Sequence, residues 1–250
     1  MTTRFQSPEG RSLAYVRTDA SAAGASRPGV VFLSGFKSDM TGTKALFLED
    51  WAQRHGRAFL RFDYSGHGDS SEDFLDGSIG DWAADAVAAI SALTRGPQIL
   101  VGSSMGGWIA LLVCLAMPER VAALVGIAAA PDFTEDSMWD GFDDGQRAAL
   151  MNEGAIELPS EYDEPYIITR RLIEDGRSRL VLRDPLPLPF AVRLLQGTAD
   201  VDVPPSVALR LLDHADCADL RLTLVKGADH RFSEPENLAL LAKTLEDLEV

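Results

Sequence analysis

The chain has 250 residues, of which 46% are hydrophobic and 24% are charged, a composition typical of soluble globular proteins. Its 38 acidic residues outnumber the 23 basic ones and give a formal net charge of −15, which argues against nucleic acid and anionic membrane surfaces as partners. No apolar run reaches the roughly 18 residues needed to span a bilayer, and the first residues lack the pattern of a secretory signal, so we expect a cytoplasmic protein without a membrane span.

Apolar runs alternate with turn residues along the first half of the chain. An edge hairpin is predicted over residues 4–7 and 12–17, followed by buried strands at 29–33, 58–64, 98–101 and 121–129. Helices are predicted over 43–55, 79–93 and 108–117, the second with Ser78 as its N-cap. Strands and helices that alternate with short connections are typical of a mostly parallel sheet with helices on both faces.

The alternation breaks over residues 131–190, where 14 acidic residues face 6 arginines and no strong strand pattern occurs. A segment of this length between two sheet strands is expected to be a helical lid over the strand ends. An ordinary surface excursion is the alternative. Aromatic and methionine side chains favour the lid and are candidates for a substrate pocket, namely Phe133, Met138, Trp139 and Phe142.

After residue 190 the alternation resumes. A strand is predicted at 191–197, a helix at 204–214, a strand at 220–226 and a last helix that begins near Ser233. We therefore expect one domain over residues 1–250, with a sheet of about eight strands and residues 131–190 inserted as the lid after the sixth strand.

A Gly-x-Ser-x-Gly pattern lies between a predicted strand and a predicted helix. It indicates a nucleophile elbow, in which Ser104 stands at a sharp turn with its hydroxyl exposed above the sheet. Gly102 and Gly106 are needed because strand and helix approach closely at such a turn. A frame centred on Ser103 is excluded, because large side chains would occupy the glycine positions.

A serine hydroxyl needs a base and an acid that orients the base. In chains with such an elbow, the order is nucleophile, acid, histidine. His230 follows the last predicted strand and is the candidate base, whereas His67 precedes Ser104 and is a candidate for the border of the substrate pocket. Asp200 is favoured as the acid because it comes first after the next-to-last strand, and Asp202 is the alternative.

Two backbone N–H groups are expected to bind the oxyanion that forms when the serine attacks a carbonyl. The first belongs to Met105, directly after the nucleophile, and the second to Phe36 in the loop after an early strand.

Three further motifs accompany the elbow: Gly-Thr-Lys-Ala at 42–45, Arg-Phe-Asp-Tyr-Ser-Gly at 61–66 and Asp-His-Arg at 229–231. Together with the run from Gly96 to Trp108 they resemble the α/β-hydrolase superfamily of serine hydrolases, and more closely the group typified by mitochondrial alpha/beta-hydrolase domain-containing protein 10. The resemblance implies the α/β-hydrolase fold. It also implies hydrolysis of acyl thioesters, including palmitoyl groups on protein cysteines, or of carboxylic esters such as acyl glucuronides.

The sequence therefore predicts a serine hydrolase that needs no metal or cofactor and acts on a small-molecule or acylated-protein substrate. Neither Cys114 nor Cys217 has a partner at metal-ligand spacing, and both are expected to be reduced. One alternative keeps the triad but cleaves another bond, such as a carbon–carbon bond in a diketone. A second is a hydrolase-fold binding protein without turnover, which has no need of a complete triad.

Overall fold

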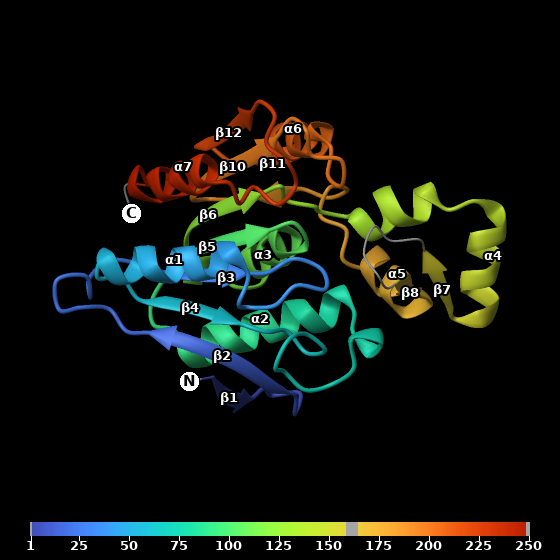
Figure 1. Cartoon of the computed structure of the whole chain (residues 1–250), viewed down its shortest axis with the longest axis horizontal. Helices are drawn as coiled ribbons and strands as arrows, with labels where there is room; N and C mark the ends of the chain where they lie inside the picture. Colours follow the sequence, from blue (N-terminus) through green and yellow to red (C-terminus); the bar gives the residue numbers. More distant parts are fainter. Residues whose placement is uncertain (1, 159–164, 249–250) are drawn as a thin grey trace.

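The computed structural model describes residues 2–158 and 165–248, and its centre is an eight-stranded sheet (Figure 1). The β1–β2 and β2–β4 pairs are antiparallel and the other pairs are parallel, as predicted from the alternation in the sequence. In sheet order the strands are β1 (Thr3–Gln6), β2 (Ser12–Thr18), β4 (Phe59–Phe62), β3 (Gly29–Leu33), β5 (Gln98–Ser103), β6 (Val121–Ile127), β10 (Ala191–Gly197) and β12 (Leu220–Val225).

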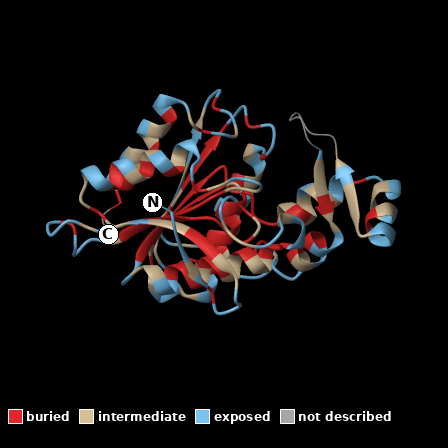
Figure 2. Cartoon of the chain, turned by 60° about the horizontal axis from the view of Figure 1, so that its bottom comes forward, coloured by how far each residue is buried: buried red, intermediate tan, exposed pale blue. Residues whose placement is uncertain are grey.

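Helices cover both faces of the sheet. α1 (Thr43–Arg54) and α7 (Pro235–Glu246) pack on one face, and α2 (Ile79–Leu93), α3 (Met105–Ala116) and α6 (Pro205–His214) pack on the other. Consecutive side chains of a strand point to opposite faces of the sheet. Val30 therefore packs in the core beneath α1 and α7, and Val31 packs in the core beneath α2, α3 and α6. Buried residues accordingly fill the inner strands β3, β4, β5 and β6 and the inner sides of these helices (Figure 2).

Helix ends follow the predicted caps with one exception. Ser78 caps α2, because its side chain accepts a hydrogen bond from the backbone N–H of Asp81. The last helix begins at Pro235, with Glu234 at the N-cap, rather than near Ser233. Proline suits the first helical position, since its fixed φ is already helical and its missing N–H would have no partner there. None of the helices in the described part of the chain is long and apolar enough to cross a membrane.

The segment between β6 and β10 is not wholly helical, which corrects the prediction from sequence. Besides η3 (Thr134–Trp139), α4 (Asp144–Glu153) and α5 (Arg170–Arg177), it contains an antiparallel pair, β7 (Ala155–Leu158) and β8 (Tyr166–Thr169). The short strand β9 (Leu186–Pro187) pairs with β11 (Ala215–Asp216), and two further short helices, η1 (Phe74–Asp76) and η2 (Pro118–Arg120), lie outside the segment. In Figure 1 the segment extends beyond one end of the sheet.

A buried carboxylate holds the base of this inserted segment. Asp132 follows β6 and accepts hydrogen bonds from the backbone N–H groups of Val181, at 2.8 Å, and Leu182, at 3.0 Å. Its carboxylate also pairs with the Arg183 guanidinium at 3.0 Å. Burial raises the pKa of Asp132, and the hydrogen bonds oppose that shift only in part. The outgoing and returning ends of the insertion are thus joined through one side chain.

Candidate active site

Ser104 stands at the turn between β5 and α3. Its φ is +55°, in the left-handed region that few non-glycine residues adopt. A Cβ at Gly102 would lie 2.3 Å from the carbonyl oxygen of Gly106, and a Cβ at Gly106 would lie 2.0 Å from that of Leu33. The close approach of backbones therefore requires both glycines of the motif, and it holds the half-buried Ser104 side chain above the sheet.

His230 connects Ser104 to Asp200 by hydrogen bonds. Its Nε2 lies 3.1 Å from the Ser104 Oγ, and its Nδ1 lies 2.9 Å from the Asp200 Oδ2. The side chain of His230 is 23% exposed and that of Asp200 is 0% exposed, so the pair opens to solvent on the histidine side alone. The structure thus brings together the three side chains that the sequence selected from three separate loops.

Asp200 is held as a carboxylate by several donors. Its Oδ1 accepts from the backbone N–H groups of Val203, at 2.8 Å, and Asp202, at 3.0 Å. The side-chain amide of Gln196 donates to its Oδ2 at 3.0 Å. Burial opposes ionisation of Asp200, but the hydrogen bond from His230 and those from the backbone outweigh it, so the pKa of Asp200 is lowered. Its geometry suits the anionic partner of an imidazole.

Asp202, the alternative acid, occupies a different environment. It is exposed, and it contributes its backbone N–H to Asp200. Potential ligand atoms of Asp200, Asp202 and His230 lie within 4.8 Å of one another. A metal ion there would compete with the hydrogen bonds that Asp200 and His230 already make, so the arrangement fits proton transfer better than metal binding.

Backbone contacts fix the acid loop against the histidine loop. Thr198 N–H donates to the Val225 carbonyl at 2.9 Å, and Ala199 N–H donates to the Ala228 carbonyl at 3.0 Å. Asp229 Oδ1 accepts from the backbone N–H of Phe232 at 3.0 Å and so shapes the turn that carries His230. These contacts set the distance between Asp200 and His230.

The candidate oxyanion loop lies directly against Ser104, the candidate nucleophile. A Cβ at Gly35 would be 3.4 Å from the Ser104 Cβ, so the loop backbone touches the serine. Within the described residues, neither the Phe36 N–H nor the Met105 N–H has a backbone acceptor. Both groups are therefore available to a ligand.

Two charged residues of the 61–66 motif hold the far end of this loop. Asp63 Oδ1 accepts from the Met40 N–H at 2.7 Å, and the Arg61 guanidinium donates to the Met40 carbonyl at 2.9 Å. The Met40 peptide is thus clamped on both sides. This clamp positions the chain between Phe36 and the start of α1.

The structure places His67 behind the candidate oxyanion loop, against rings that also contact Phe36. Its ring lies in edge-to-face contact with Tyr64, Phe74 and Trp82, at centroid distances of 5.5, 5.1 and 5.1 Å. Burial lowers the pKa of His67 to about 4, so the imidazole is neutral near pH 7. His67 does not line the cavity at Ser104.

The four candidate pocket residues of the insertion are divided between two places. The ring centroid of Phe133 lies 5.8 Å from that of Phe36, next to the candidate oxyanion loop. Trp139 packs on Phe142 at 6.3 Å, in the outer part of the insertion, and Met138 is partly buried. Like His67, none of the four lines the cavity at Ser104.

The cavity at Ser104 has a volume of about 190 Å³ and is more charged than the sequence indicated. Lys44, Arg231 and Asp39 contribute to it, and the signal for Lys44 was its position in the 42–45 motif, directly after the oxyanion loop. Its described lining consists of Phe32, Gly35, Phe36, Ser38, Asp39, Gly42, Thr43, Lys44, Ser103, Ser104, His230 and Arg231.

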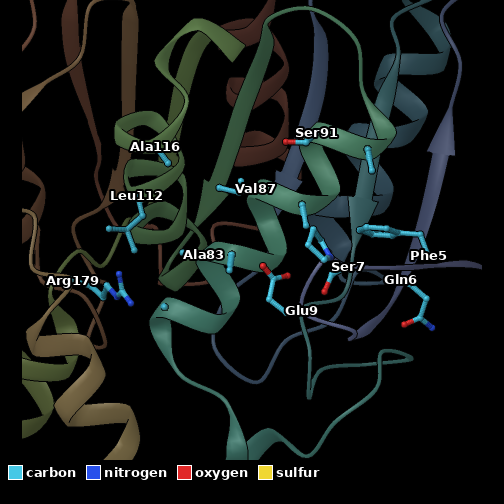
Figure 3. Close-up of a pocket in the computed structure, with 15 residues that line it drawn as sticks. Phe5, Gln6, Ser7, Glu9, Ala83, Val87, Ser91, Leu112, Ala116 and Arg179 are labelled. Atoms are coloured by element: carbon cyan, nitrogen blue, oxygen red, sulfur yellow. The ribbon is translucent and has the colours of Figure 1, made fainter.

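A larger groove, of about 780 Å³, lies away from this site between β1, α2 and α3 (Figure 3). Phe5 of β1, Val87 of α2 and Leu112 of α3 contribute to its apolar lining. None of Ser104, His230 or Asp200 reaches it, so we do not assign it to the substrate's acyl group.

Comparison with known proteins agrees with the fold. The family described as serine aminopeptidase, S33, matches residues 24–153. A rat protein named palmitoyl-protein thioesterase ABHD10, mitochondrial, is 37% identical over 96% of this chain and 80% of its own length. A putative hydrolase from Agrobacterium vitis is 40% identical with a TM-score of 0.94, over 99% of this chain and 98% of that one. Mouse alpha/beta-hydrolase domain-containing protein 10 is 33% identical with a TM-score of 0.90, over 99% of this chain and 98% of that one. The chain therefore belongs to the α/β-hydrolase family, in the group of alpha/beta-hydrolase domain-containing protein 10.

Proposed function

We propose that the chain is a serine hydrolase that cleaves acyl esters or thioesters through a covalent acyl-enzyme. The observation that carries this proposal is the continuous hydrogen-bonded chain from the Ser104 hydroxyl through His230 to the buried Asp200. The rat relative is named a palmitoyl-protein thioesterase, which supports an acylated protein or small molecule as the substrate.

In the acylation step, His230 Nε2 accepts the Ser104 proton while the Oγ attacks the carbonyl carbon. The N–H groups of Phe36 and Met105 stabilise the resulting oxyanion. Protonated His230 then gives its proton to the leaving alcohol or thiol, and the acyl group stays on Ser104. In the deacylation step His230 activates a water molecule by the same route. Asp200 orients the imidazole and stabilises its charged form throughout.

We also propose that residues 131–190 act as a lid within one domain and complete an apolar acyl site. Phe133 of the insertion lies 5.8 Å from the Phe36 ring, and Tyr166 of β8 lies 6.4 Å from it. These contacts supply an apolar wall on the insertion side of the nucleophile. Met138, Trp139 and Phe142 lie farther along the insertion and support its internal packing.

Labelling with a fluorophosphonate probe tests the nucleophile. The intact protein should label, and Ser104→Ala should not, because the probe reacts with an activated serine. Ser103→Ala is the matched control, since Ser103 also lines the cavity but does not contact His230. Unchanged labelling of Ser104→Ala would exclude Ser104 as the nucleophile, and absent labelling of the intact protein would favour a binding protein.

A substrate series then defines the bond that is cleaved. The kcat/KM values for p-nitrophenyl esters and for acyl thioesters of increasing chain length should rise with the apolar surface of the acyl group until the pocket is filled. Turnover of a diketone in place of every ester and thioester would contradict the proposed bond.

The compartment is a separate proposal. We propose a cytoplasmic location, whereas the rat relative is named as mitochondrial. Subcellular fractionation of the source cells with an antibody against this chain decides between them, and enrichment in an organelle fraction would contradict the cytoplasmic assignment.

A further inference from the structure

Lys44 places an ammonium group in the cavity of the proposed nucleophile. It is one of four lysines in the chain, and it lines the same small cavity as Ser104 and His230. Its Nζ donates a hydrogen bond to the main-chain carbonyl of Arg231, the residue directly after the proposed base. The charge is therefore fixed on the histidine side of the cavity.

The surroundings of Lys44 compensate its charge only in part. Across the residues that the structure describes, its ammonium forms no ion pair with a carboxylate. Asp39 lines the cavity too, but its carboxylate accepts from the backbone N–H and the hydroxyl of Thr41. Asp229 is the acidic residue whose charge acts on Lys44, and the positive Arg231 opposes it.

Two further features disfavour a cation at this position. Lys44 lies in the first turn of α1, where the helix dipole is positive and no acidic residue is present. Burial lowers the pKa of Lys44 to about 8, with the attraction of Asp229 opposing the shift. Lys44 is half-buried, and an ammonium that forms no ion pair and is held beside a nucleophile suits a role in binding.

The proton transfer from His230 to the leaving atom identifies which part of the substrate lies near Lys44. His230 must protonate the leaving atom, so the leaving group has to lie on the side of His230 and Arg231. The aromatic rings of Phe133 and Tyr166 approach Phe36 from the insertion instead. The acyl chain and the leaving group therefore occupy different sides of the nucleophile.

We propose that Lys44 is a specificity residue that pairs with an anionic group on the leaving alcohol or thiol. The inference rests on the proposed hydrolase function and names its substrate class: esters or thioesters whose leaving group carries a negative charge a few bonds from the scissile carbonyl. The small cavity and the single ammonium suit a compact anion such as a carboxylate.

Two matched thioesters test this role. S-butanoyl-3-mercaptopropionate carries a carboxylate on the leaving thiol, and S-butanoyl-3-mercaptopropionamide carries a neutral amide of nearly the same shape. We expect kcat/KM to favour the carboxylate substrate by about tenfold in the intact protein, as for a hydrogen bond between charged groups. The ratio should fall to about one in Lys44→Gln and stay well above one in Lys44→Arg, which keeps the charge.

Lys37→Gln is the control, because Lys37 is an exposed lysine of the same loop that contacts the rings of Phe74 and Tyr166 rather than the cavity. Its ratio should equal that of the intact protein. A ratio of one in the intact protein, or an unchanged ratio in Lys44→Gln, would overturn the role of Lys44. If Lys44→Gln does not fold, a ratio near one in folded Lys44→Arg overturns it too. Failure to hydrolyse either thioester would instead contradict the proposed hydrolase function, since both carry the same acyl group.

Discussion

Asp200 and Asp202 are two residues apart, yet only Asp200 contacts the proposed base. We expect Asp200→Asn to lower kcat roughly 10³- to 10⁴-fold, because the amide cannot stabilise the imidazolium and favours the wrong tautomer of His230. Asp202→Asn should stay within about fivefold, since an exposed charge contributes roughly 0–1 kcal/mol. Steady-state hydrolysis of p-nitrophenyl butyrate measures both, and the reverse ranking would transfer the acid role to Asp202.

The pH dependence of substrate preference reports on Lys44. An amine is charged below its pKa and neutral above it, and the pKa of Lys44 is lowered to about 8. The preference for the carboxylate thioester over the amide should therefore be complete near pH 7 and decline as the pH rises through about 8. Because both substrates carry the same acyl group, the ratio of the two kcat/KM values cancels any pH dependence that they share. A ratio that stays constant between pH 7 and pH 9 would contradict the assignment.

At the scale of elements, the insertion depends on its buried anchor, Asp132. Replacing it with alanine leaves the N–H groups of Val181 and Leu182 and the Arg183 guanidinium without their acceptor. We expect Asp132→Ala to lower the free energy of unfolding by about 3 kcal/mol. The exposed Asp140 of the same insertion provides the control, and Asp140→Ala should stay within about 0.5 kcal/mol. Urea unfolding, monitored by tryptophan fluorescence, measures both changes in the free energy of unfolding. Equal changes would show that Asp132 stabilises the protein no more than an exposed carboxylate does.

The sheet and the elbow were predictable from sequence because each has a local cause. The strand at Gly29–Leu33 is buried at every residue and is therefore a continuous apolar run in the sequence. Gly106 has no alternative at its position, since its backbone lies against Leu33. Features that depend on neighbouring residues, or on a close backbone approach that only glycine permits, can be recognised from the sequence alone.

The hairpin β7–β8 was missed because its strands are short and their partners are set by packing. Ile156 and Ile168 face each other across the pair, but an acidic stretch surrounds both, and six residues between the strands lie outside the described part of the chain. The positions of Asp200 and His230 were predictable from chain order alone, because each follows a strand in the order that such an elbow requires. The role of Lys44 in the cavity was not, because it depends on how α1 packs against the loop that follows β12.

At the scale of the whole molecule, the proposed triad spans half of the sheet. Ser104 follows the central strand β5, Asp200 follows β10, and His230 follows β12, which is the last strand at that edge. The large buried side chains Trp51, Trp82 and Trp108 belong to the helices that pack on the two faces. The proposed nucleophile therefore follows an inner strand covered by helices on both faces, and the proposed base follows an edge strand.

The edge position of β12 has a consequence for inactivation. Among the strands that the structure describes, β12 pairs with β10 alone, and none of its residues is fully buried, so its local opening costs less than global unfolding. Opening would carry His230 away from Ser104 while both cores remain intact. In a urea titration, we expect hydrolytic activity to disappear at a lower denaturant concentration than the far-UV circular dichroism signal. Coincident midpoints would mean that β12 opens only with the rest of the molecule, and that the catalytic side chains share the full cooperativity of the fold.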